Sequence, residues 1–570
     1  MYRFAPSRRG PRHEQEMNFG GNAVTIFSHA VASFDPTANS VLLWTRITGA
    51  TSADWMVATD PEFAGVVVRG TAATGPESDF TVVVDAGGLQ PATSYWYRFE
   101  AASERSPVGR TRTLPAGEVS SFSLGLVSCA RFSVAPLTVY RAMGQAEVDL
   151  VVHLGDYIYD DAGDKGPRSH DPPGELMQLE DYRKRLAQIR GDRDCQALHM
   201  RHPMAFVWDD HDFADNAWLG GAKEHDPDKH GEWSRRRDAA VQAHREWLPW
   251  RQADPAEPLC IYRSAPIGDL AELILLDSRI IGRDCQASFP GSKPIDDPTR
   301  SLLGDPQREW LKRRLADESH PWALVANGVA VNPIPMKLPF ARLTRPLLPE
   351  GYVAVDDQQV LRDDQWDGYP AERSRLVEFL ALRAAAGGRT VLLAGDVHSS
   401  WAFEGPDGPD GKPVAVEVTV PSVSSAPMGR TRMPGVWRLL DRAARKMEHV
   451  RWAEVTARGF AVVRVGSEEV RVAWWFVDPY DTGDVPETHL GAAFRTRLKT
   501  WPPRWEEAEP PEALPGRIGM PELPPRPDDV RYVRLWHLGK RMGLLALLGG
   551  AGVSVVAGLE RLVRFLRDRR

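Results

Sequence analysis

The sequence is poor in cysteine, with four cysteines among its 570 residues. Cys129, Cys195, Cys260 and Cys285 are widely separated along the chain. This number and spacing exclude the dense disulfide framework that stabilises small secreted domains. We therefore expect mostly reduced thiols, and any cysteine with a special role should owe it to a metal or to its reactivity.

The sequence also lacks a strong charge of either sign. It has 70 basic and 77 acidic residues, which gives a formal net charge of −7. This mild acidity argues against sequence-specific nucleic-acid binding through a general basic face, although a local site could still bind a phosphorylated small substrate.

A chain of this length has room for two or three domains.

An apolar run is missing from the N-terminus. Arg8 and Arg9 could suggest a twin-arginine export signal, but the polar residues 10–14 follow them. We expect no signal peptide unless translation starts upstream, and a cytoplasmic or membrane-associated protein rather than a secreted one.

Near the other end, residues 542–559 are uncharged and flanked by basic residues, but they are short for a spanning helix and contain five glycines. They could associate with a membrane surface or pack on the protein itself.

The first part of the chain has the alternating pattern of short strands. VLLWTRI (residues 41–47) and DFTVVVDA (residues 79–86) are examples, and residues 89–101 resemble the tyrosine corner of β-sandwiches, with Tyr95 or Tyr97 as the tying tyrosine. After a disordered stretch at residues 1–22, we expect an immunoglobulin- or fibronectin-like β-sandwich. The alternative is an edge extension of the main domain.

From Ser123 onward, apolar strands alternate with helices, which predicts an α/β domain. The expected divisions of the chain are a sandwich at 23–115, a main domain at 121–480, a proline-rich arm at 481–530 and a C-terminal apolar and basic helix at 531–570. The arm is predicted because residues 501–529 contain nine prolines. We find no internal repeat.

Polar side chains collect where the strands of the main domain end, and in this fold class sites gather beyond the carboxyl ends of strands. The set is Cys129, Asp156, Tyr159, Asp209, Asp210, His211, Asp212, Asn216, Asn327, Asp396 and His398. So many carboxylates cannot share a pocket unless a cation neutralises them, which predicts a metal cluster. The alternative is a network of salt bridges with arginines.

The residue types indicate which metals would bind. Oxygen ligands suit hard cations such as calcium, magnesium or manganese. A tyrosinate ligand needs a stronger Lewis acid, because a free phenol titrates near pH 10. Trivalent iron meets that need and would also accept the thiolate of Cys129. We infer two unlike metals, one ferric ion and one or two hard divalent ions.

The motifs GDYIYD, WDDHDFADNAW, LLDSR, DQWDGYPAER and AGDVHSSW occur in this order. Together with VASFDPTANSVLLWTRITG, they resemble the PhoD family of alkaline phosphatases and phosphodiesterases over residues 27–477. The resemblance implies the calcineurin-like metallophosphoesterase fold, a two-sheet β-sandwich flanked by helices. It also implies a centre of Fe³⁺ and one or two Ca²⁺, with other divalent metals as substitutes.

The resemblance assigns metal-binding roles by motif. The implied ligands are Cys129, Asp156, Tyr159, Asp210, Asn216, Asp396 and His398. Asp156 would bridge the two main metals, and Tyr159, Cys129 and His398 would face the iron. Asp210 would hold the divalent ion.

The resemblance also implies the reaction, hydrolysis of a phosphate mono- or diester by a metal-bridging hydroxide. Asp156 would be catalytic as the metal bridge, and His211 would contact the phosphate or protonate the leaving group. Arg131 would bind the phosphate, or would be only a surface arginine. Asn327, Trp366 and Tyr369 are expected near the substrate, although the two aromatic residues could instead pin their loop. Asp160 and Asp161 are expected to be surface charges.

We expect a monomeric enzyme, an alkaline phosphatase or a phosphodiesterase. The rival interpretation is a membrane-associated binding or adhesion protein in which the metal centre is vestigial. The absence of a GxSxG motif means that no covalent serine step is required.

Overall fold

The computed structural model describes residues 25–163, 166–252, 257–334, 362–428, 447–509 and 511, together with the backbone of three short strands. These strands form a small sheet of their own: β15 (Met336–Lys337), β17 (Gln359–Arg362) and β16 (Tyr352–Ala354). Within the described part of the chain, no helix is both long and apolar enough to cross a membrane. The expected disordered stretch 1–22 and the expected helix 531–570 lie outside the described residues.

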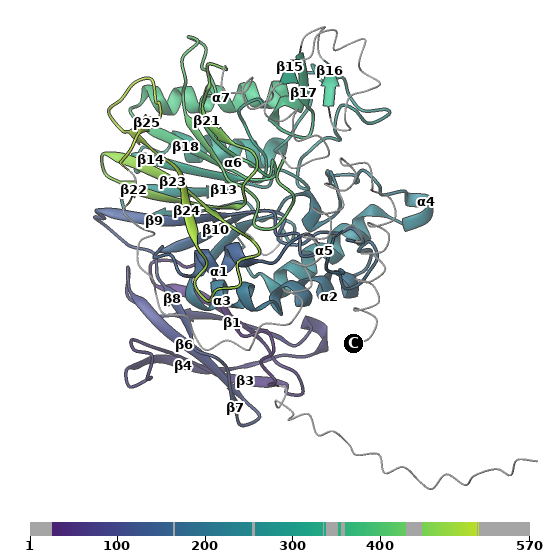
Figure 1. The fold of residues 1–570 in the computed structure, drawn as a ribbon, viewed down its shortest axis with the longest axis vertical. Helices are drawn as coiled ribbons and strands as arrows, with labels where there is room; N and C mark the ends of the chain where they lie inside the picture. Colours follow the sequence, from purple (N-terminus) through teal and green to yellow (C-terminus); the bar gives the residue numbers. More distant parts are fainter. Residues whose placement is uncertain are drawn as a thin grey trace, which may run out of the picture.

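Two large sheets form the centre of the molecule (Figure 1). The ten-stranded sheet has the spatial order β25 (Glu506–Glu507), β24 (Thr488–Arg497), β23 (Glu469–Val477), β22 (Gly459–Gly466), β9 (Ser121–Val127), β10 (Leu150–Leu154), β11 (Met204–Val207), β1 (Val31–Phe34), β2 (Ser40–Arg46) and β5 (Thr81–Gly87). The seven-stranded sheet has the order β12 (Arg263–Ile267), β13 (Ala271–Leu275), β14 (Trp322–Asn327), β18 (Arg389–Ala394), β20 (Val416–Thr419), β19 (Ser400–Glu404) and β21 (Val450–Glu454). The strands β9, β10 and β11 are parallel, as are β13, β14, β18 and β20.

Alternating side chains divide the interior into layers, because successive residues of a strand point to opposite faces. In β10, Val152 lies in the core between the two sheets, and Val151 lies in the core under the helices that cover the outer face. Those helices include α1 (Thr138–Gly144), α2 (Leu179–Arg190), α3 (Arg193–Arg201) and α5 (Trp233–Trp247), with the short α4 (Pro227–His230) nearby in the chain. The other sheet is covered by α6 (Gly304–Ala316) and α7 (Pro370–Ala385). The predicted two-sheet sandwich flanked by helices is confirmed.

The N-terminal part combines the two arrangements considered from the sequence. A second sheet of β4 (Val66–Ala73), β3 (Ser52–Ala58), β6 (Ser94–Ala101), β7 (Glu104–Arg105) and β8 (Gly109–Arg112) packs on β1, β2 and β5 and encloses a separate core. However, β1 also pairs in parallel with β11, so one layer of this sandwich continues the ten-stranded sheet. The hydroxyl of Tyr95 accepts a hydrogen bond of 2.8 Å from the backbone N–H of Gln90, which identifies Tyr95 as the tyrosine of the corner.

The ten-stranded sheet extends beyond residue 480, where the sequence analysis placed the start of an extended arm. Strand β24 pairs along its length with β23, and β25 pairs with β24. The prolines that suggested an arm begin at Pro502, after β24 has ended. The arm prediction is therefore wrong for residues 488–497, and most of its remainder lies outside the described residues.

Candidate metal centre

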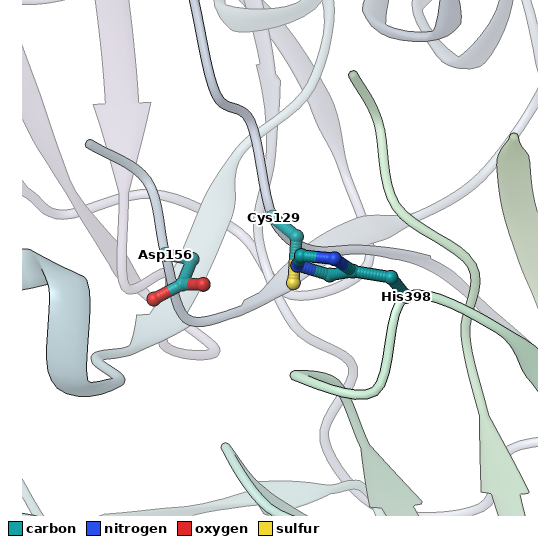
Figure 2. Close-up of side chains that lie close together, drawn as sticks. All are labelled: Cys129, Asp156 and His398. Atoms are coloured by element: carbon teal, nitrogen blue, oxygen red, sulfur yellow. The ribbon is translucent and has the colours of Figure 1, made fainter. Parts of the chain in front are cut away.

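Three strand ends bring metal-binding residue types to one point. Cys129 follows β9, Asp156 follows β10, and His398 follows β18. Their ligand atoms lie within 4.8 Å of one another, and Figure 2 shows the three side chains close together. Two further groups satisfy the same limit, Asp156 with Asp210 and His211, and Asp156 with Asp209, Asp210 and Asp396. Asp156 belongs to all three groups, which is the geometry that a bridging carboxylate requires.

The phenol of Tyr159 lies inside this cluster. Its hydroxyl donates to Asp156 Oδ2 at 2.8 Å and lies 3.2 Å from His398 Nε2. Ser425 Oγ donates to the same hydroxyl at 2.7 Å. Burial, reinforced by the carboxylate of Asp156 and by Cys129, raises the pKa of Tyr159 well above its usual range. The phenol would therefore ionise only if a strong cation bound beside it.

The charges around the carboxylates of the cluster compensate them only in part. Burial raises the pKa of Asp156 well above its usual range, and the charges of Asp210 and Asp209 add to this effect against the influence of His211. Burial likewise raises the pKa of the Cys129 thiol, with Asp156 contributing. Asp209 Oδ2 and Asp210 Oδ1 are buried without a hydrogen-bond partner, although the guanidinium of Arg279 lies 3.3 Å from Asp210 Oδ1. Buried carboxylates that are only partly compensated, beside a thiol and an imidazole, fit multivalent cations, so the residues present suit the implied metals.

The arginine network considered as the alternative is present on one side of the cluster. Arg279 donates to Asp209 Oδ1 and to Asp364, and its NH2 group lies 3.3 Å from Asp210 Oδ1. Arg283 donates to Asp364 as well. Neither guanidinium forms an ion pair with Asp156 within the described part of the chain. The network therefore pairs with carboxylates on the Asp209 side of the cluster and does not reach Asp156.

The backbone is unusual at several of the predicted ligands. The φ angles are positive at Cys129 (59°), Asp156 (58°), Asn216 (54°), Asp396 (60°) and His398 (51°). Residues other than glycine rarely adopt this conformation, and such positions cluster at functional sites. The backbone N–H of Asn216 donates to Asp210 Oδ2 at 2.7 Å, so Asn216 lies beside the predicted divalent-ion ligand.

Glycine is required between β10 and Asp156. Gly155 has a φ of 95°, and a Cβ atom built on it would lie 2.5 Å from Asp209 Cβ. This close approach brings the loop after β10 against the loop after β11. The two loops carry Asp156 and Asp210, so Gly155 allows the two carboxylates to meet.

His211 has a buried partner that the sequence analysis did not predict. Its Nδ1 lies 2.8 Å from Asp160 Oδ1, and Asp160 Oδ2 accepts a bond of 3.1 Å from Arg236. The expectation that Asp160 is a surface charge is therefore wrong. Its burial is tolerated because a guanidinium and an imidazole compensate its charge.

Arg131 lies at the edge of the cluster. Its guanidinium pairs with Asp161 at 2.5 Å and lies over the ring of Tyr159, with 5.1 Å to the ring centroid. Asp161 keeps 34% of its side chain exposed, so it is partly the surface charge that was expected. The side chain of Arg131 is 25% exposed, which leaves it accessible to a substrate.

Three predicted substrate-binding residues are fully buried instead. The indole of Trp366 donates to Asn327 Oδ1 at 3.2 Å, and the amide of Asn327 donates to the carbonyl of Leu393 at 3.4 Å. The hydroxyl of Tyr369 donates to the carbonyl of Asp284 at 2.7 Å. Trp366 and Tyr369 have no exposed surface and Asn327 has 1%. These hydrogen bonds match the alternative that the aromatic residues pin their loop, and the expected contact with substrate is not supported.

Other residues at the cluster were not assigned roles from the sequence. Gln365 donates to Asp396 and accepts the backbone N–H of Ala330 at 2.7 Å. Asp209 and Asp212 belong to the motif WDDHDFADNAW, and Arg279 belongs to LLDSR. The motifs do not show which residues bind a metal and which only support a ligand, because this depends on the contacts that each side chain makes in the folded protein.

Comparisons with known proteins match the chain over most of its length. Residues 124–474 match the family model described as "PhoD-like phosphatase", and residues 18–115 match "PhoD-like phosphatase, N-terminal domain". The sequence is 35% identical to alkaline phosphatase D of Bacillus subtilis (strain 168) over 401 residues, which span 66% of this chain and 65% of that protein. A solved structure titled "Structure of PhoD" superposes with a TM-score of 0.73 at 29% identity, covering 86% of this chain and 94% of the other.

Proposed function

The chain belongs to the PhoD-like phosphatase family, and from this premise we propose that it is a metal-dependent phosphoric ester hydrolase. The proposed reaction is hydrolysis of a phosphomonoester, a phosphodiester or both. The proposed cofactors are one ferric ion and one or two calcium ions.

One observation carries the proposal. A thiol, a phenol, an imidazole and a shared carboxylate converge around Asp156, whose carboxylate lies within 4.8 Å of Cys129 and His398 and accepts the hydroxyl of Tyr159 at 2.8 Å. This donor set suits a ferric ion, because the buried phenol and the buried thiol both need a strong Lewis acid beside them to ionise. Asp210 and Asp396 offer oxygen donors on the other side of Asp156, as a hard divalent ion prefers.

The residues of the chain would hold and orient the reacting groups. Metal ions in such a site supply Lewis acidity and lower the pKa of a bound water. Cys129, Tyr159 and His398 would hold the ferric ion, and Asp210 and Asp396 would hold calcium, with Asn216 beside them. Asp156 would be the carboxylate that the two ions share, because it belongs to all three groups of possible ligands.

His211 and Arg131 are the proposed contacts to the phosphate. The bond from His211 Nδ1 to Asp160 fixes the ring and leaves Nε2 to contact a phosphoryl oxygen or to protonate the leaving alkoxide. Arg131 can add a charge-assisted hydrogen bond to a second oxygen. Its pairing with Asp161 keeps the guanidinium oriented at the edge of the cluster.

The proposal is tested by metal analysis and hydrolysis assays on the purified full-length chain. We expect bound iron and calcium, hydrolysis of p-nitrophenyl phosphate or of bis-p-nitrophenyl phosphate, and loss of both activities on chelation. The ratio of the two activities separates a monoesterase from a diesterase. Activity without iron would contradict the ferric assignment alone, and full activity of Asp156→Ala would contradict the hydrolytic centre as a whole.

A further inference from the structure

The proposed centre depends on two loops that carry its carboxylates. The loop after β10 carries Asp156, and the loop after β11 carries Asp209 and Asp210. The loop after β10 has no regular structure at Asp156, which adopts a left-handed conformation with a φ of 58°, and the loop after β11 contains one short 3₁₀ turn, Asp210–Asp212. Contacts between the two loops are therefore needed to fix the distance between them.

Asp212 makes this contact with both loops at once. Its Oδ2 accepts the backbone N–H of Asp156 at 2.9 Å and the backbone N–H of Asp209 at 2.9 Å. Its Oδ1 accepts the backbone N–H of Tyr157 at 3.0 Å. The side chain of Asp212 is 1% exposed, so these bonds do not compete with bulk water.

Helix α5 contacts the carboxylate of Asp212 through the side chain of His244. His244 Nε2 lies 3.2 Å from Asp212 Oδ1, and His244 Nδ1 lies 2.9 Å from the carbonyl oxygen of Ala240 on the same helix. The imidazole has no exposed surface. The contact with Ala240 orients the ring, and the ring in turn orients the carboxylate.

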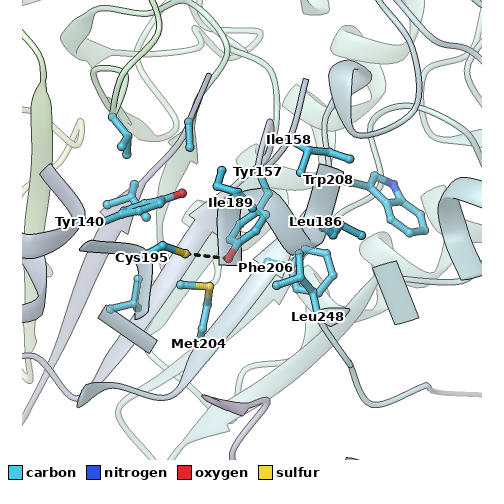
Figure 3. Close-up of a cluster of buried hydrophobic side chains, with 14 of the residues drawn as sticks. Tyr140, Tyr157, Ile158, Leu186, Ile189, Cys195, Met204, Phe206, Trp208 and Leu248 are labelled. Carbon is cyan, nitrogen blue, oxygen red and sulfur yellow. Dashed lines mark hydrogen bonds between the residues drawn. The ribbon is translucent and has the colours of Figure 1, made fainter. Parts of the chain in front are cut away.

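The loop after β10 is also anchored through the side chain of Tyr157. Its hydroxyl lies 3.1 Å from Cys195 Sγ and 2.8 Å from His199 Nε2, and Figure 3 shows the bond to Cys195 within the hydrophobic cluster. This anchor holds the position of Tyr157 but has no contact with the loop after β11. The two loops also touch where Asp156 Oδ1 accepts the backbone N–H of His211 at 3.3 Å and where His211 Nδ1 lies 2.8 Å from Asp160 Oδ1. Asp212 differs from these contacts because one of its oxygens accepts backbone N–H groups from both loops.

We propose that Asp212 is the positioning residue of the metal centre, which fixes the separation of the Asp156 and Asp210 carboxylates without touching either metal or substrate. The inference rests on the proposed function for the identity of the centre. The part of the inference that concerns the two loops depends only on hydrogen bonds within the chain. An aspartate is required because both carboxylate oxygens accept N–H groups, whereas one side of an asparagine would present donors to them.

The test compares Asp212→Asn with Asp192→Asn in the full chain. Asp192 is the matched control, since its carboxylate also accepts backbone N–H groups, from Asp194 at 2.9 Å and Cys195 at 3.4 Å, but at the start of helix α3. We expect Asp212→Asn to release its metals at a chelator concentration about 10- to 100-fold lower than the parent protein, as losses of supporting hydrogen bonds at metal sites do. Asp192→Asn should release them at the parent concentration.

Hydrogen exchange followed by mass spectrometry on chelator-treated protein gives a readout that does not involve metal or activity. Peptides spanning residues 154–160 should exchange faster in Asp212→Asn than in the parent protein, and should be unchanged in Asp192→Asn. Unchanged exchange and unchanged metal retention in Asp212→Asn would overturn the inference. A parent protein that holds no metal would instead count against the proposed function, and the exchange experiment would still decide the role of Asp212.

A second variant covers the case in which Asp212→Asn does not fold. His244→Gln leaves the carboxylate in place and removes the imidazole behind it. We then expect the same changes in exchange and metal retention, but smaller. A folded His244→Gln protein that matches the parent in both measurements would overturn the inference.

Discussion

Tyr159 is the residue on which the chemical identity of the proposed centre depends most directly. We expect Tyr159→Phe to remove the visible absorption that a phenolate bound to ferric iron produces, because the ring remains but its oxygen is lost. We also expect kcat for p-nitrophenyl phosphate to fall by at least tenfold, as for other changes around a metal site. Absorption spectra and steady-state assays on the metal-loaded protein measure both effects.

Tyr157→Phe is the matched control for this change, two positions away in the same loop. Its hydroxyl bonds to His199 and Cys195 in the core and not to the cluster. We expect this variant to keep the absorption band and to lose about 1 kcal/mol of unfolding free energy with the hydrogen bond. An unchanged band in Tyr159→Phe would contradict the assignment of Tyr159 as an iron ligand.

The sequence predicts which residue types lie at the strand ends of the site, but it does not predict which of the residues around the site are buried. Cys129, Asp156 and His398 were predictable because each follows an apolar strand, and parallel strands end at one edge of a sheet. The buried position of Asp160 was not predictable, because its partner Arg236 lies 76 positions away along the chain. The hydrogen bond between Trp366 and Asn327, 39 positions apart, is hidden in the same way.

At the scale of elements, the apolar strands of the central layers were predictable and the edge strand β24 was not. Strands β10 (LVVHL) and β13 (AELIL) are buried along their whole length, so each appears as an apolar run with a single polar residue. Most of β24 is only partly buried, and its sequence THLGAAFRTR has few strand-forming residues. Its pairing with β23 supplies the stability that the local sequence does not indicate.

The packing of β10 against helix α1 predicts a pH dependence of stability. His153 of β10 is fully buried, and its Nε2 lies 2.7 Å from the hydroxyl of Tyr140 on α1. Burial lowers the pKa of His153 from its ordinary 6.5 to about 4. Between these values the unfolded chain binds a proton that the folded chain does not, so stability is complete above pH 6.5 and falls as the pH drops toward 4.

This group alone should lower the free energy of unfolding by roughly 2 kcal/mol between pH 7 and pH 5. We expect His153→Gln to reduce the difference between the two pH values by that amount, as measured by urea denaturation. His489→Gln is the control, because it also removes one imidazole, but the side chain of His489 is 65% exposed. Identical pH dependence in the parent protein and in His153→Gln would contradict the argument.

At the scale of the whole molecule, the N-terminal sandwich and the main domain form one continuous structure. Strand β1 joins the ten-stranded sheet beside β11, and Asp35, directly after β1, pairs with Arg263 of β12 in the other large sheet. Both oxygens of Asp35 accept bonds of 2.6 Å from Arg263, and Asp35 Oδ2 accepts the backbone N–H of Arg251 at 2.8 Å. A single buried carboxylate therefore ties the sandwich to both large sheets.

This arrangement predicts that the two parts unfold together. We expect one calorimetric transition for the parent protein, and a loss of about 3–5 kcal/mol in Asp35→Asn, because removing one partner leaves the buried guanidinium of Arg263 without its counter-ion. Asp85→Asn is the matched control. Asp85 also binds a guanidinium, that of Arg251, with both oxygens, but its side chain is 53% exposed, so the loss should be no more than about 1 kcal/mol. Two separate transitions in the parent protein would show that the sandwich unfolds as an independent unit. Equal losses in the two variants would show that Asp35 does not couple the sandwich to the main domain.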